Sequence, residues 1–370
     1  MRHIICLAQS KWSADPERTQ HLMRLLNDVE ISYFELTVTA NITSYLKDQN
    51  TLEAREPHPG IKVYRVPSIL FWKNGSTLPE KWSMRKTQKA IRRCLRDAGV
   101  RNGLLWCATP VIADIIEQIP HNGLIYDCYR AWDRYPERME SQLAYDADLV
   151  FAASDNLMEH VSPCNQNTFL LANGVNYGLY ARGGNPETRP DPAFDRFRGT
   201  VFGYFGNVER NMDLRPVLYA AKRNPDWTFV IIGRVKAGHP DAVRIKQAKN
   251  IFCLGHRSPA DVPGCLAACD VCFDLLHNDI ADEDVVPERI YAYFAAQKPV
   301  ACVYPRRYVP EYPDVVYGAQ GDEEFEQACL KAANELGRRK RIRRGQYARA
   351  ADWSDRAHLL HQILRDNGML

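Results

Sequence analysis

The stretch Pro287-Glu-Arg-Ile-Tyr-Ala-Tyr-Phe-Ala-Ala-Gln-Lys-Pro-Val300 decides the fold that we expect for this chain. Proline suits the first turn of a helix, because its missing N–H group would have no partner there. The other N–H groups of that turn attract anions, and Arg289 lies beside them. A Lys-Pro-Val sequence then leads into the apolar run Ala301–Val303. The segment therefore predicts a short helix at the carboxyl edge of a sheet, able to bind a phosphate-bearing ligand such as a nucleotide sugar.

The composition is typical of a globular protein with two domains. At 370 residues the chain is too long for one ordinary core. Hydrophobic residues make up 45% and charged residues 25%, which excludes a disordered chain. The net charge of +3 is too small to indicate nucleic-acid binding. No apolar stretch approaches the roughly 18–20 residues that a membrane span needs, and Met1–Leu7 turns polar too early for a signal peptide.

The cysteines predict neither disulfides nor a metal site. Eleven of them, an odd number, are scattered through apolar runs, which indicates reduced thiols in the cytoplasm. Cys265, Cys269 and Cys272 have the spacing of an iron–sulfur loop. The first two close a predicted helix and the third lies in the next strand, so their thiols would not converge on one cluster. We expect no bound metal.

Short apolar runs alternate with amphipathic stretches, which is typical of βαβ units and a parallel sheet. The predicted strands are His3–Leu7, Ile31–Leu36, Ile61–Arg65, Gly103–Cys107, Leu124–Asp127, Leu149–Ala152, Thr168–Leu171, Thr200–Tyr204, Thr228–Ile232, Asn250–Leu254, Val271–Leu275, Val300–Val303 and Val315–Tyr317. The predicted helices are Pro16–Asn27, Glu80–Ala98, Thr109–Gln118, Glu137–Tyr145, Asp155–Val161, Arg215–Lys222, Ala260–Ala268, Pro287–Ala296, Glu323–Leu336 and Asp352–Asp366.

The pattern stops and restarts around Gly183–Pro192, which is rich in proline and glycine and indicates a linker. We expect an N-terminal domain over residues 1–180, a linker over 181–197 and a C-terminal domain over 198–345. A last helix, within 346–370, should pack across the domain junction. The fold class is then α/β, with two Rossmann-like, doubly wound parallel sheets that face each other across a cleft. Such sheets bind ligands at the carboxyl ends of their strands.

Cations and glycines follow the predicted strands of the second half. Gly206 and Asn207 come directly after the first of these strands, where glycine lets a ligand approach the backbone closely. Arg210 lies four residues after Gly206, and Arg234 and Lys236 follow the next strand. Taken singly, each cation could be a solvated surface residue instead of a ligand-binding one. Gathered with Arg289 in one cleft, the arginines would offset the charge of a diphosphate.

The first half offers carboxylates and an aromatic side chain. Asp127 ends a predicted strand and Asp133 follows it; either could bind a sugar hydroxyl or act as a general base. The alternatives are that Asp127 caps the next segment and that Asp133 is solvated. Trp12 in the first loop could stack on a sugar or lipid acceptor, with Ser13 beside it. Ser13 or Asp15 could instead be the N-cap of the following helix.

A basic helix is predicted over residues 81–96, where Trp82, Met84, Ile91 and Leu95 lie among lysines and arginines. Attachment to an anionic membrane surface would fit this pattern, since each basic residue near such a surface contributes about 1 kcal/mol. A solvated helix face would fit it equally. Nucleic-acid binding would also need base-stacking aromatics or groove-reading motifs, and the sequence has none.

Taken together, these motifs resemble the GT-B-fold glycosyltransferases of the glycosyltransferase 4 type, especially the bacterial group of teichuronic acid and cell-surface polysaccharide biosynthesis. The resemblance covers nearly the whole chain. Its marks are Trp12 and Arg18, Leu104–Pro110, Ile125–Cys128, Ala147–Ser154, Asn173–Asn176, Gly203–Gly206, Pro225–Trp227, Pro287–Val300 and Asp352–Arg356.

This resemblance implies that the second domain holds a nucleotide-sugar donor, most simply a UDP-sugar, and that the first holds the acceptor. It implies no cofactor and no obligatory metal. By position, Arg289 resembles the family's cation at the donor phosphates, and Gly206 and Asn207 resemble its donor-side glycine loop. The other donor-side positions implied are Arg210, Arg234, Lys236, Asp284, Pro287, Glu288 and Ile290; Trp12, Ser13 and Arg18 are the acceptor-side ones.

Two positions depart from the family pattern. Ala292 stands where similar enzymes carry a glutamate that binds the nucleotide ribose, and losing one charged hydrogen bond costs roughly 1.5–3 kcal/mol of affinity. Asp282, Glu283 or Asp284 could supply the other acidic group of the family's pair. Gln297 replaces the usual glycine of the turn. We therefore expect the ribose to be held in an atypical way.

The hypothesis that follows is a hexosyltransferase of cell-surface glycan synthesis that uses a lipid-linked or polysaccharide acceptor. It would lie in the cytoplasm, peripherally on the inner face of the plasma membrane. Retention at the anomeric carbon is implied, with Arg289 and Arg210 stabilising the leaving group. An inverting reaction would need Asp127 or Asp133 as base. The alternatives are a non-catalytic scaffold subunit, which Ala292 favours, and a sugar-nucleotide epimerase or hydrolase.

Overall fold

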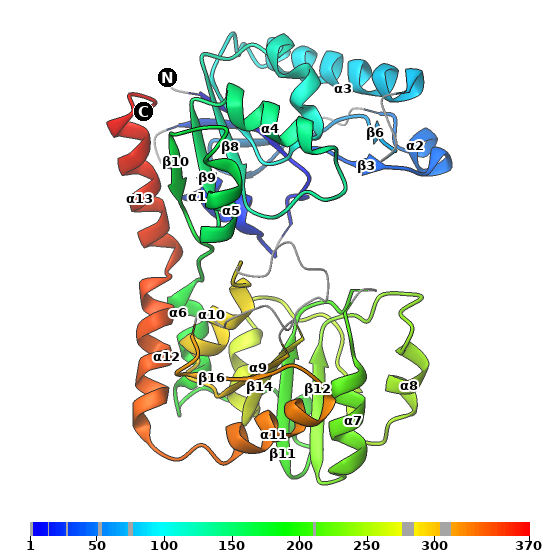
Figure 1. Cartoon of the computed structure of the whole chain (residues 1–370), viewed down its shortest axis with the longest axis vertical. Helices are drawn as coiled ribbons and strands as arrows, with labels where there is room; N and C mark the ends of the chain where they lie inside the picture. The colour runs from blue at the N-terminus through cyan, green and yellow to red at the C-terminus, as the bar shows by residue number, and fades with distance from the viewer. Residues whose placement is uncertain are drawn as a thin grey trace. The chain divides into compact units, whose positions relative to one another are not determined.

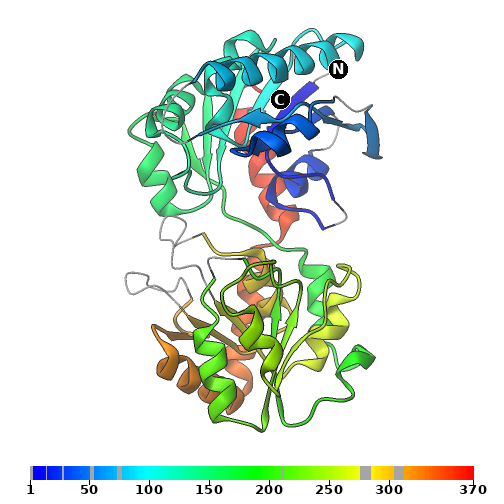
Figure 2. The ribbon, with the colours of Figure 1, turned by 90° about the vertical axis from the view of Figure 1, so that its right-hand side faces the viewer.

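The computed structural model describes residues 3–13, 15–26, 29–50, 54–72, 77–209, 212–275, 285–303 and 312–370. Two compact units make up the chain (Figures 1 and 2). The first consists of residues 1–172 and 356–370, and the second of residues 173–355. Helix α13 (Trp353–Asp366) contains the second boundary, so that its residues 353–355 belong to the second unit.

An eight-stranded sheet forms the middle of the first unit, in the order β10-β9-β8-β7-β1-β2-β5-β4. All neighbouring strands are parallel except β4 and β5. The central strands are almost wholly buried, which explains their continuous apolar runs. The strands are β1 (His3–Ala8), β2 (Glu30–Glu35), β4 (Arg55–His58), β5 (Ile61–Arg65), β7 (Leu104–Cys107), β8 (Gly123–Cys128), β9 (Leu149–Ala152) and β10 (Thr168–Leu170). A separate pair is formed by β3 (Val38–Thr39) and β6 (Ile69–Leu70).

The helices of the first unit begin where the sequence offers caps. In α3 the Thr77 hydroxyl accepts from the Glu80 N–H, while the Glu80 carboxylate accepts from the Thr77 N–H, which is a capping box. In α5 the Ser154 hydroxyl accepts from the Leu157 N–H and caps the helix. The helices are α1 (Arg18–Leu25), α2 (Ile42–Lys47), α3 (Leu78–Asp97), α4 (Glu137–Asp146) and α5 (Asp155–Val161), with the 3₁₀ helix η1 (Pro110–Gln118) between β7 and β8.

A six-stranded parallel sheet forms the middle of the second unit, in the order β13-β12-β11-β14-β15-β16. The strands are β11 (Thr200–Phe205), β12 (Trp227–Ile232), β13 (Ile251–Cys253), β14 (Val271–Leu275), β15 (Val300–Val303) and β16 (Val316–Ala319). The helices are α6 (Tyr177–Tyr180), α7 (Arg215–Arg223), α8 (Ala242–Gln247), α9 (Val262–Ala268), α10 (Glu288–Ala295), α11 (Asp322–Ala333) and α12 (Arg338–Ala350), with 3₁₀ turns η2 (Ala181–Gly184) and η3 (Pro192–Phe194). Both doubly wound sheets were predicted, and both are confirmed.

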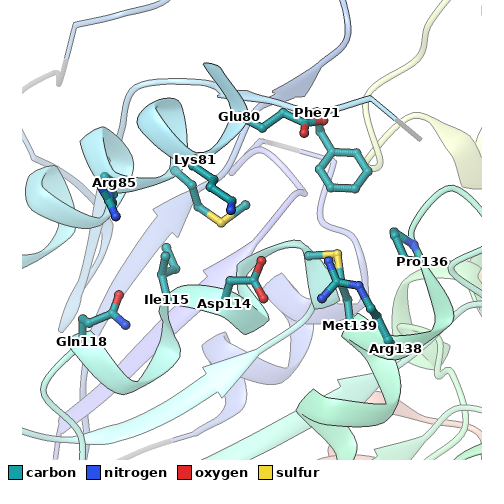
Figure 3. Close-up of a pocket in the computed structure, with 11 residues that line it drawn as sticks. Phe71, Glu80, Lys81, Arg85, Asp114, Ile115, Gln118, Pro136, Arg138 and Met139 are labelled. Carbon is teal, nitrogen blue, oxygen red and sulfur yellow. The ribbon is translucent and has the colours of Figure 1, made fainter. Parts of the chain in front are cut away.

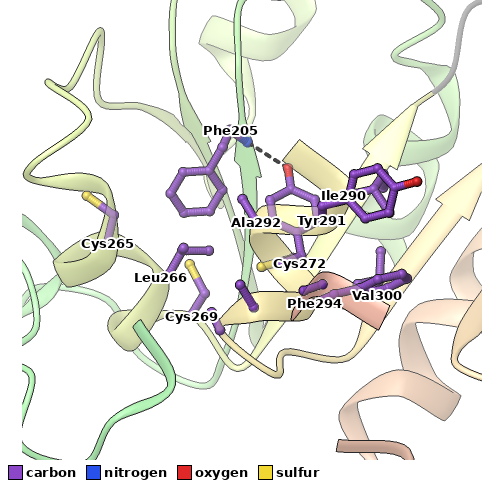
Figure 4. Packing of buried hydrophobic residues seen from close by; sticks show 14 of the residues in the cluster. Phe205, Cys265, Leu266, Cys269, Cys272, Ile290, Tyr291, Ala292, Phe294 and Val300 are labelled. Carbon is purple, nitrogen blue, oxygen red and sulfur yellow. Dashed lines mark hydrogen bonds between the residues drawn. The ribbon is translucent and has the colours of Figure 1, made fainter. Parts of the chain in front are cut away.

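Apolar clusters cover the two faces of this second sheet. One contains residues of α7 and α11 and the other contains residues of α9 and α10. Helix α10 is apolar on most sides, and Tyr291, Ala292 and Phe294 lie deep in its cluster (Figure 4). The Tyr293 hydroxyl accepts a hydrogen bond of 3.0 Å from the Phe205 N–H. This bond ties the helix to the last residue of β11 and fixes where α10 begins relative to the sheet.

The segment 181–197, predicted as a linker, is part of the second unit. Phe194 and Phe197 are buried in its core cluster, with their rings 5.5 Å apart. A side chain at Gly183 would approach the Leu266 Cβ atom within 2.7 Å, so this turn packs tightly on α9. Burial of these aromatics outweighs the proline and glycine content, and the unit accordingly begins at residue 173.

Candidate functional site

The second sheet reverses its strand order between β11 and β14. The chain runs from β11 outward through β12 and β13, and then returns to build β14, β15 and β16 on the other side. Ligands of doubly wound sheets bind outside the carboxyl ends of the strands at such a switch point. Gly206 and Asn207 follow β11, Gly233 and Arg234 follow β12, and the N-terminus of α10 follows β14 in the chain.

The two glycine loops are joined through their backbones. Gly206 and Gly233 have φ angles of +145° and +154°, which favour glycine. A Cβ atom at Gly233 would lie 1.9 Å from the Gly206 carbonyl oxygen, so only glycine fits this approach. The Asn207 side-chain oxygen accepts from the Arg234 N–H at 3.1 Å. A parallel bridge between Val208 and Val235 continues the junction.

Arg289 lies in the first turn of α10 and is held by a buried carboxylate. Its Nε and Nη2 atoms donate to the two oxygens of Asp274 at 2.5 and 2.9 Å. Asp274 is fully buried near the end of β14, whereas the Arg289 side chain keeps 25% of its surface exposed. The guanidinium carbon also lies 5.5 Å from the ring centre of Tyr204. Burial alone would lower the pKa of Arg289, but the Asp274 charge outweighs it and the pKa is raised.

The Tyr204 ring connects this cation to the glycine loops. Its hydroxyl donates to the Asn207 carbonyl oxygen at 3.3 Å. Arg289, Tyr204 and Asn207 therefore form a continuous chain of contacts along the carboxyl edge of β14, β11 and β12. Pro287 is the N-cap residue of α10, one position before the helix, with φ at −65°. Arg289, Gly206 and Asn207, which sequence analysis predicted on one edge, are thus brought together.

The other donor-side candidates differ in their surroundings. Arg234 and Lys236 are exposed, and the Lys236 ammonium pairs with Glu209. Glu288 is half-buried in the first turn of α10. Ile290 is 95% buried in the core cluster, so its side chain packs the helix and does not face a ligand. Arg210 and Asp284 lie outside the described residues.

Both departures from the family pattern have structural consequences. Ala292 is buried among apolar side chains, so the position supplies no carboxylate to a ribose. Gln297 has a φ angle of +56° and is the non-glycine residue with positive φ among the described residues. The turn thus demands the conformation that a glycine adopts most easily. The Gln297 side-chain oxygen accepts a hydrogen bond of 2.8 Å from the Arg341 Nε atom.

The first sheet has its own switch point, between β1 and β7, and Asp127 lies near it on β8. Asp127 is fully buried and accepts from Arg18 Nε and Nη2 at 3.1 and 2.9 Å. Arg18 is itself 94% buried. A carboxylate in this position holds α1 to the sheet. Neither group faces solvent, so this geometry does not support the expected roles of Asp127 as a general base and of Arg18 as an acceptor contact.

Trp12 is also buried, with 4% of its surface exposed. Its ring packs edge-on against Tyr33 at 5.1 Å, and the Arg24 guanidinium lies 5.2 Å from its centre. The stacking role predicted for Trp12 is not available to a ring enclosed in this way. Ser13 is exposed and bonds locally to the Asp15 backbone. Asp133 is exposed in a turn, where a substrate could reach it.

Sequence reasoning missed the polar group at the switch point of the first sheet. The Gln9 amide donates to the Thr109 hydroxyl and to the Tyr135 hydroxyl, both at 2.7 Å. Gln9 directly follows β1, Thr109 follows β7 and Tyr135 precedes α4. For Gln9 and Thr109 the position after a strand was the available signal, but none of the three side chains carries a charge. Asp274 was missed because it lies inside an apolar strand.

Among the described residues there is no cluster of three or more histidine, cysteine or acidic side chains that could hold a metal ion. The three thiols with the spacing of an iron–sulfur loop are buried: Cys265 lies in α9, Cys269 is its C-cap residue and Cys272 lies in β14. Across the same described ranges, no helix is both long enough and apolar enough to cross a bilayer.

Comparison with known proteins places this geometry in context. No family model matches the chain. TuaH of Bacillus subtilis (strain 168), which bears the name of a teichuronic acid biosynthesis glycosyltransferase, is 25% identical over 352 residues, covering 86% of this chain and 85% of TuaH. This sequence relationship runs through both units.

Solved structures agree with the fold. A trehalose-phosphate synthase from Burkholderia xenovorans, in complex with glucose-6-phosphate, superposes with a TM-score of 0.72 at 11% identity over 99% of this chain and 100% of that one. Sucrose-phosphate synthase from Thermosynechococcus elongatus gives a TM-score of 0.68 at 14% identity, over 99% of each chain. Anabaena HepE, solved with UDP and glucose, gives 0.62 at 17% identity, over 98% of this chain and 99% of that one. The GT-B fold is confirmed.

Proposed function

We propose that this chain, a glycosyltransferase of the GT-B fold related to TuaH, moves a sugar from a nucleoside diphosphate, most simply UDP, to a lipid-linked or polysaccharide acceptor of a cell-surface glycan. The observation that carries the donor assignment is the Arg289–Asp274 pair beside the two glycine loops of the second unit. Helix N–H groups, backbone amides near glycine and a fixed guanidinium are the groups that bind a pyrophosphate.

The arrangement supports leaving-group stabilisation as the main catalytic effect. Two nitrogens of Arg289 are engaged by Asp274, and among the described residues its Nη1 atom has no hydrogen-bond partner. That edge of the guanidinium can therefore donate to a phosphate oxygen. As the sugar departs, negative charge grows on the diphosphate, and a preorganised donor stabilises that charge without reorganising.

We propose a retaining reaction, in which the protein supplies no nucleophile. The buried position of Asp127, in its ion pair with Arg18, disfavours Asp127 as the base of an inverting reaction. Asp133 is the remaining candidate, because it is exposed and follows the strand that carries Asp127. Product stereochemistry would distinguish the two pathways, since inversion requires a base that takes the acceptor proton.

The first unit supports a peripheral membrane position. Leu78 and Trp82 on α3 keep 84% and 60% of their surfaces exposed, and Ile42 and Leu46 on α2 are also exposed. Exposed apolar groups of this size are uncommon unless they contact something. Further along α3, five exposed cations continue the same element: Arg85, Lys89, Arg92, Arg93 and Arg96. We propose that this surface lies on anionic lipid, on the cytoplasmic side of the membrane.

The experiment is a donor panel on the full chain. UDP, GDP, CDP and TDP would be titrated by calorimetry, followed by release of nucleotide from the matching glucose donors in the presence of a polyprenyl-diphosphate-linked sugar. We expect UDP to bind and UDP-glucose to be consumed in an acceptor-dependent way. Arg289→Gln should weaken UDP binding and reduce turnover by about a hundredfold, as for the loss of one preorganised donor to a developing anion.

Arg234→Gln provides a matched control, because Arg234 is an exposed arginine on the neighbouring loop. It should reduce UDP affinity less than Arg289→Gln, since no carboxylate fixes its guanidinium in the described structure. Binding of none of the four nucleotides would contradict the donor assignment. Normal turnover in Arg289→Gln would remove Arg289 from the mechanism.

A further inference from the structure

A hollow lies wholly within the first unit, whereas Arg289 belongs to the second. It is enclosed by α3, η1 and α4 and has a volume of about 500 Å³ (Figure 3). Cavities of roughly 300–1,000 Å³ are large enough for a small-molecule ligand. Nothing in the donor assignment uses this space.

The floor of the hollow is apolar. Met84 of α3, Ile115 of η1 and Met139 of α4 are buried beneath it, and Phe71 and Pro136 are half-buried at one side. Methionine side chains are flexible and adapt to the shape of what they contact. The Phe71 ring packs against Tyr135 at 5.0 Å, nearly perpendicular to it, which places an aromatic wall beside the floor.

The rim of the hollow carries charged side chains, most of which form no ion pair among the described residues. Lys81, Arg85 and Arg138 are exposed and form no ion pair among the described residues. Asp114 is likewise exposed and forms no ion pair among the described residues. The Glu80 carboxylate, in contrast, accepts hydrogen bonds from the N–H groups of Thr77 and Trp72. Figure 3 shows Lys81, Asp114 and Arg138 directed into the space between the three helices. Three cations against the two carboxylates of Asp114 and Glu80 leave one net positive charge.

We propose that this hollow binds a single-chain amphiphile with a phosphate headgroup, the alkyl chain lying on the methionine floor and the phosphate contacting Lys81, Arg85 and Arg138. The net positive charge of the lining favours a phosphate headgroup, which is negative at neutral pH. Arginines suit such a headgroup because they donate two parallel hydrogen bonds.

The position of the hollow on α3 favours a lipid over a soluble phosphate. Lys81 and Arg85 lie one turn apart on α3, and Leu78 and Trp82 form the adjoining exposed stripe. An alkyl chain leaving the floor would therefore meet exposed apolar side chains and not water. The inference rests on the proposed function in one respect: a phosphate-bearing lipid is what a lipid-linked acceptor would present to the first unit.

Calorimetry with three probes tests the proposal on the full chain, each kept below its micelle concentration. Decyl phosphate carries both parts of the ligand, decyl maltoside carries the chain without the charge, and inorganic phosphate carries the charge without the chain. We expect decyl phosphate to bind at least about tenfold more tightly than either of the others. Equal binding of decyl maltoside, or of inorganic phosphate, would overturn the proposal.

Two double variants locate the site. Arg85→Gln with Arg138→Gln should weaken decyl phosphate binding by about tenfold or more, because two charge-assisted contacts are lost. Arg92→Gln with Arg93→Gln removes two exposed cations of the same helix that do not line the hollow, and decyl phosphate affinity should stay unchanged. Equal affinities in the two variants would show binding elsewhere on α3 and overturn the assignment.

UDP affinity, measured on the same samples, separates this inference from the donor assignment. Both double variants should bind UDP as the wild type does, since their substitutions lie in the first unit. Failure of UDP binding in the wild type with intact decyl phosphate binding would contradict the proposed function alone.

Discussion

Asp274 sets the position of Arg289, although it faces no ligand itself. The carboxylate is buried at the end of β14 and grips two nitrogens of the guanidinium, so the side chain cannot swing away from the edge of the sheet. Its negative charge also offsets part of the positive charge offered to a diphosphate. The pair thus gives a guanidinium in a fixed position, although its combined charge attracts a diphosphate less than an unpaired arginine would.

Asp274→Asn tests this positioning role. The amide keeps the shape of the carboxylate but loses one acceptor, so we expect a loss of about 1–3 kcal/mol in the free energy of unfolding. Catalysis gives the discriminating measurement: kcat with a UDP-sugar should fall about tenfold, with KM changing less. Arg289→Lys keeps a charge but not the planar fork, and its kcat should be as low as that of Arg289→Gln. An Asp274→Asn enzyme with unchanged kcat would make the pair purely structural.

Asp127 and Asp133 should separate in their effects on stability. Asp127→Asn leaves Arg18 buried without its counter-charge, which costs about 3–5 kcal/mol in comparable pairs. Asp133→Asn changes an exposed turn, and its denaturant midpoint should match the wild type. Urea unfolding followed by circular dichroism measures both. A stable Asp127→Asn protein would show that the ion pair does not hold α1.

Sequence analysis located Arg289, Gly206 and Asn207 because their signals are local: a proline before a helix and glycines after a strand. The partners of charged residues were not visible in the same way. Arg18 and Asp127 are 109 positions apart, and nothing in either neighbourhood points to the other. Asp127 was consequently interpreted as a candidate base, when its strand-end position serves an internal ion pair.

At the scale of elements, the two βα loops of the second unit depend on glycine. Gly233→Ala would place a Cβ atom 1.9 Å from the Gly206 carbonyl oxygen, with φ in a region that alanine avoids. We expect a loss of at least about 2 kcal/mol in unfolding free energy. Gly178→Ala is the matched control. A Cβ atom at Gly178 would lie 4.0 Å from its nearest neighbour, and Gly178 is part of α6, where alanine is favoured. Similar melting temperatures for the two variants would contradict the close approach.

Helix α1 should make the first unit sensitive to acid. Burial, with the nearby charge of Arg24, lowers the pKa of His21 to about 4. The unfolded chain takes up this proton near pH 6.5, so the native state loses stability as pH falls from about 6.5 to 4. The loss is on the order of 3 kcal/mol.

His21→Gln should flatten that part of the stability curve. Between pH 7 and pH 4 the melting temperature of His21→Gln should fall less than that of the wild type, so the difference between the two proteins shifts in favour of the variant toward acid pH. Parallel curves would show that His21 does not carry the effect. The comparison is confined to this window, because His21 has the same charge in both states above it.

Two elements show where periodicity fails as a guide. A helix was predicted over Thr109–Gln118, and residues 110–118 form the 3₁₀ helix η1, in which the Thr109 hydroxyl accepts from the Val111 N–H. Its apolar residues are buried on most sides, so their spacing does not distinguish the two helix types. Helix α12 is absent from the predicted helices. Its inward side consists of Arg344, Gly345 and Ala348, with Arg344 bonded to Glu335, and therefore shows no apolar stripe.

At the scale of the molecule, each of the two doubly wound sheets has a switch point, and the two switch points carry different side chains. In the second unit the switch point gathers glycine loops, a helix N-terminus and a fixed arginine. In the first unit it gathers the neutral polar group of Gln9, Thr109 and Tyr135. Neutral hydrogen-bonding groups suit an acceptor hydroxyl, whereas the cationic edge suits a diphosphate. The alternation of strands and helices predicted both sheets. Which side chains meet at each switch point became visible only with the strand order.

The central claim is that the carboxyl edge of the second sheet binds the nucleotide. Hydrogen–deuterium exchange of the full chain, with and without saturating UDP, tests it directly. The largest protection should fall on peptides that contain residues 205–209, 232–236 and 287–292, with little change over β8 of the first unit. Protection concentrated in the first unit, or none at a concentration that saturates UDP binding, would contradict the account.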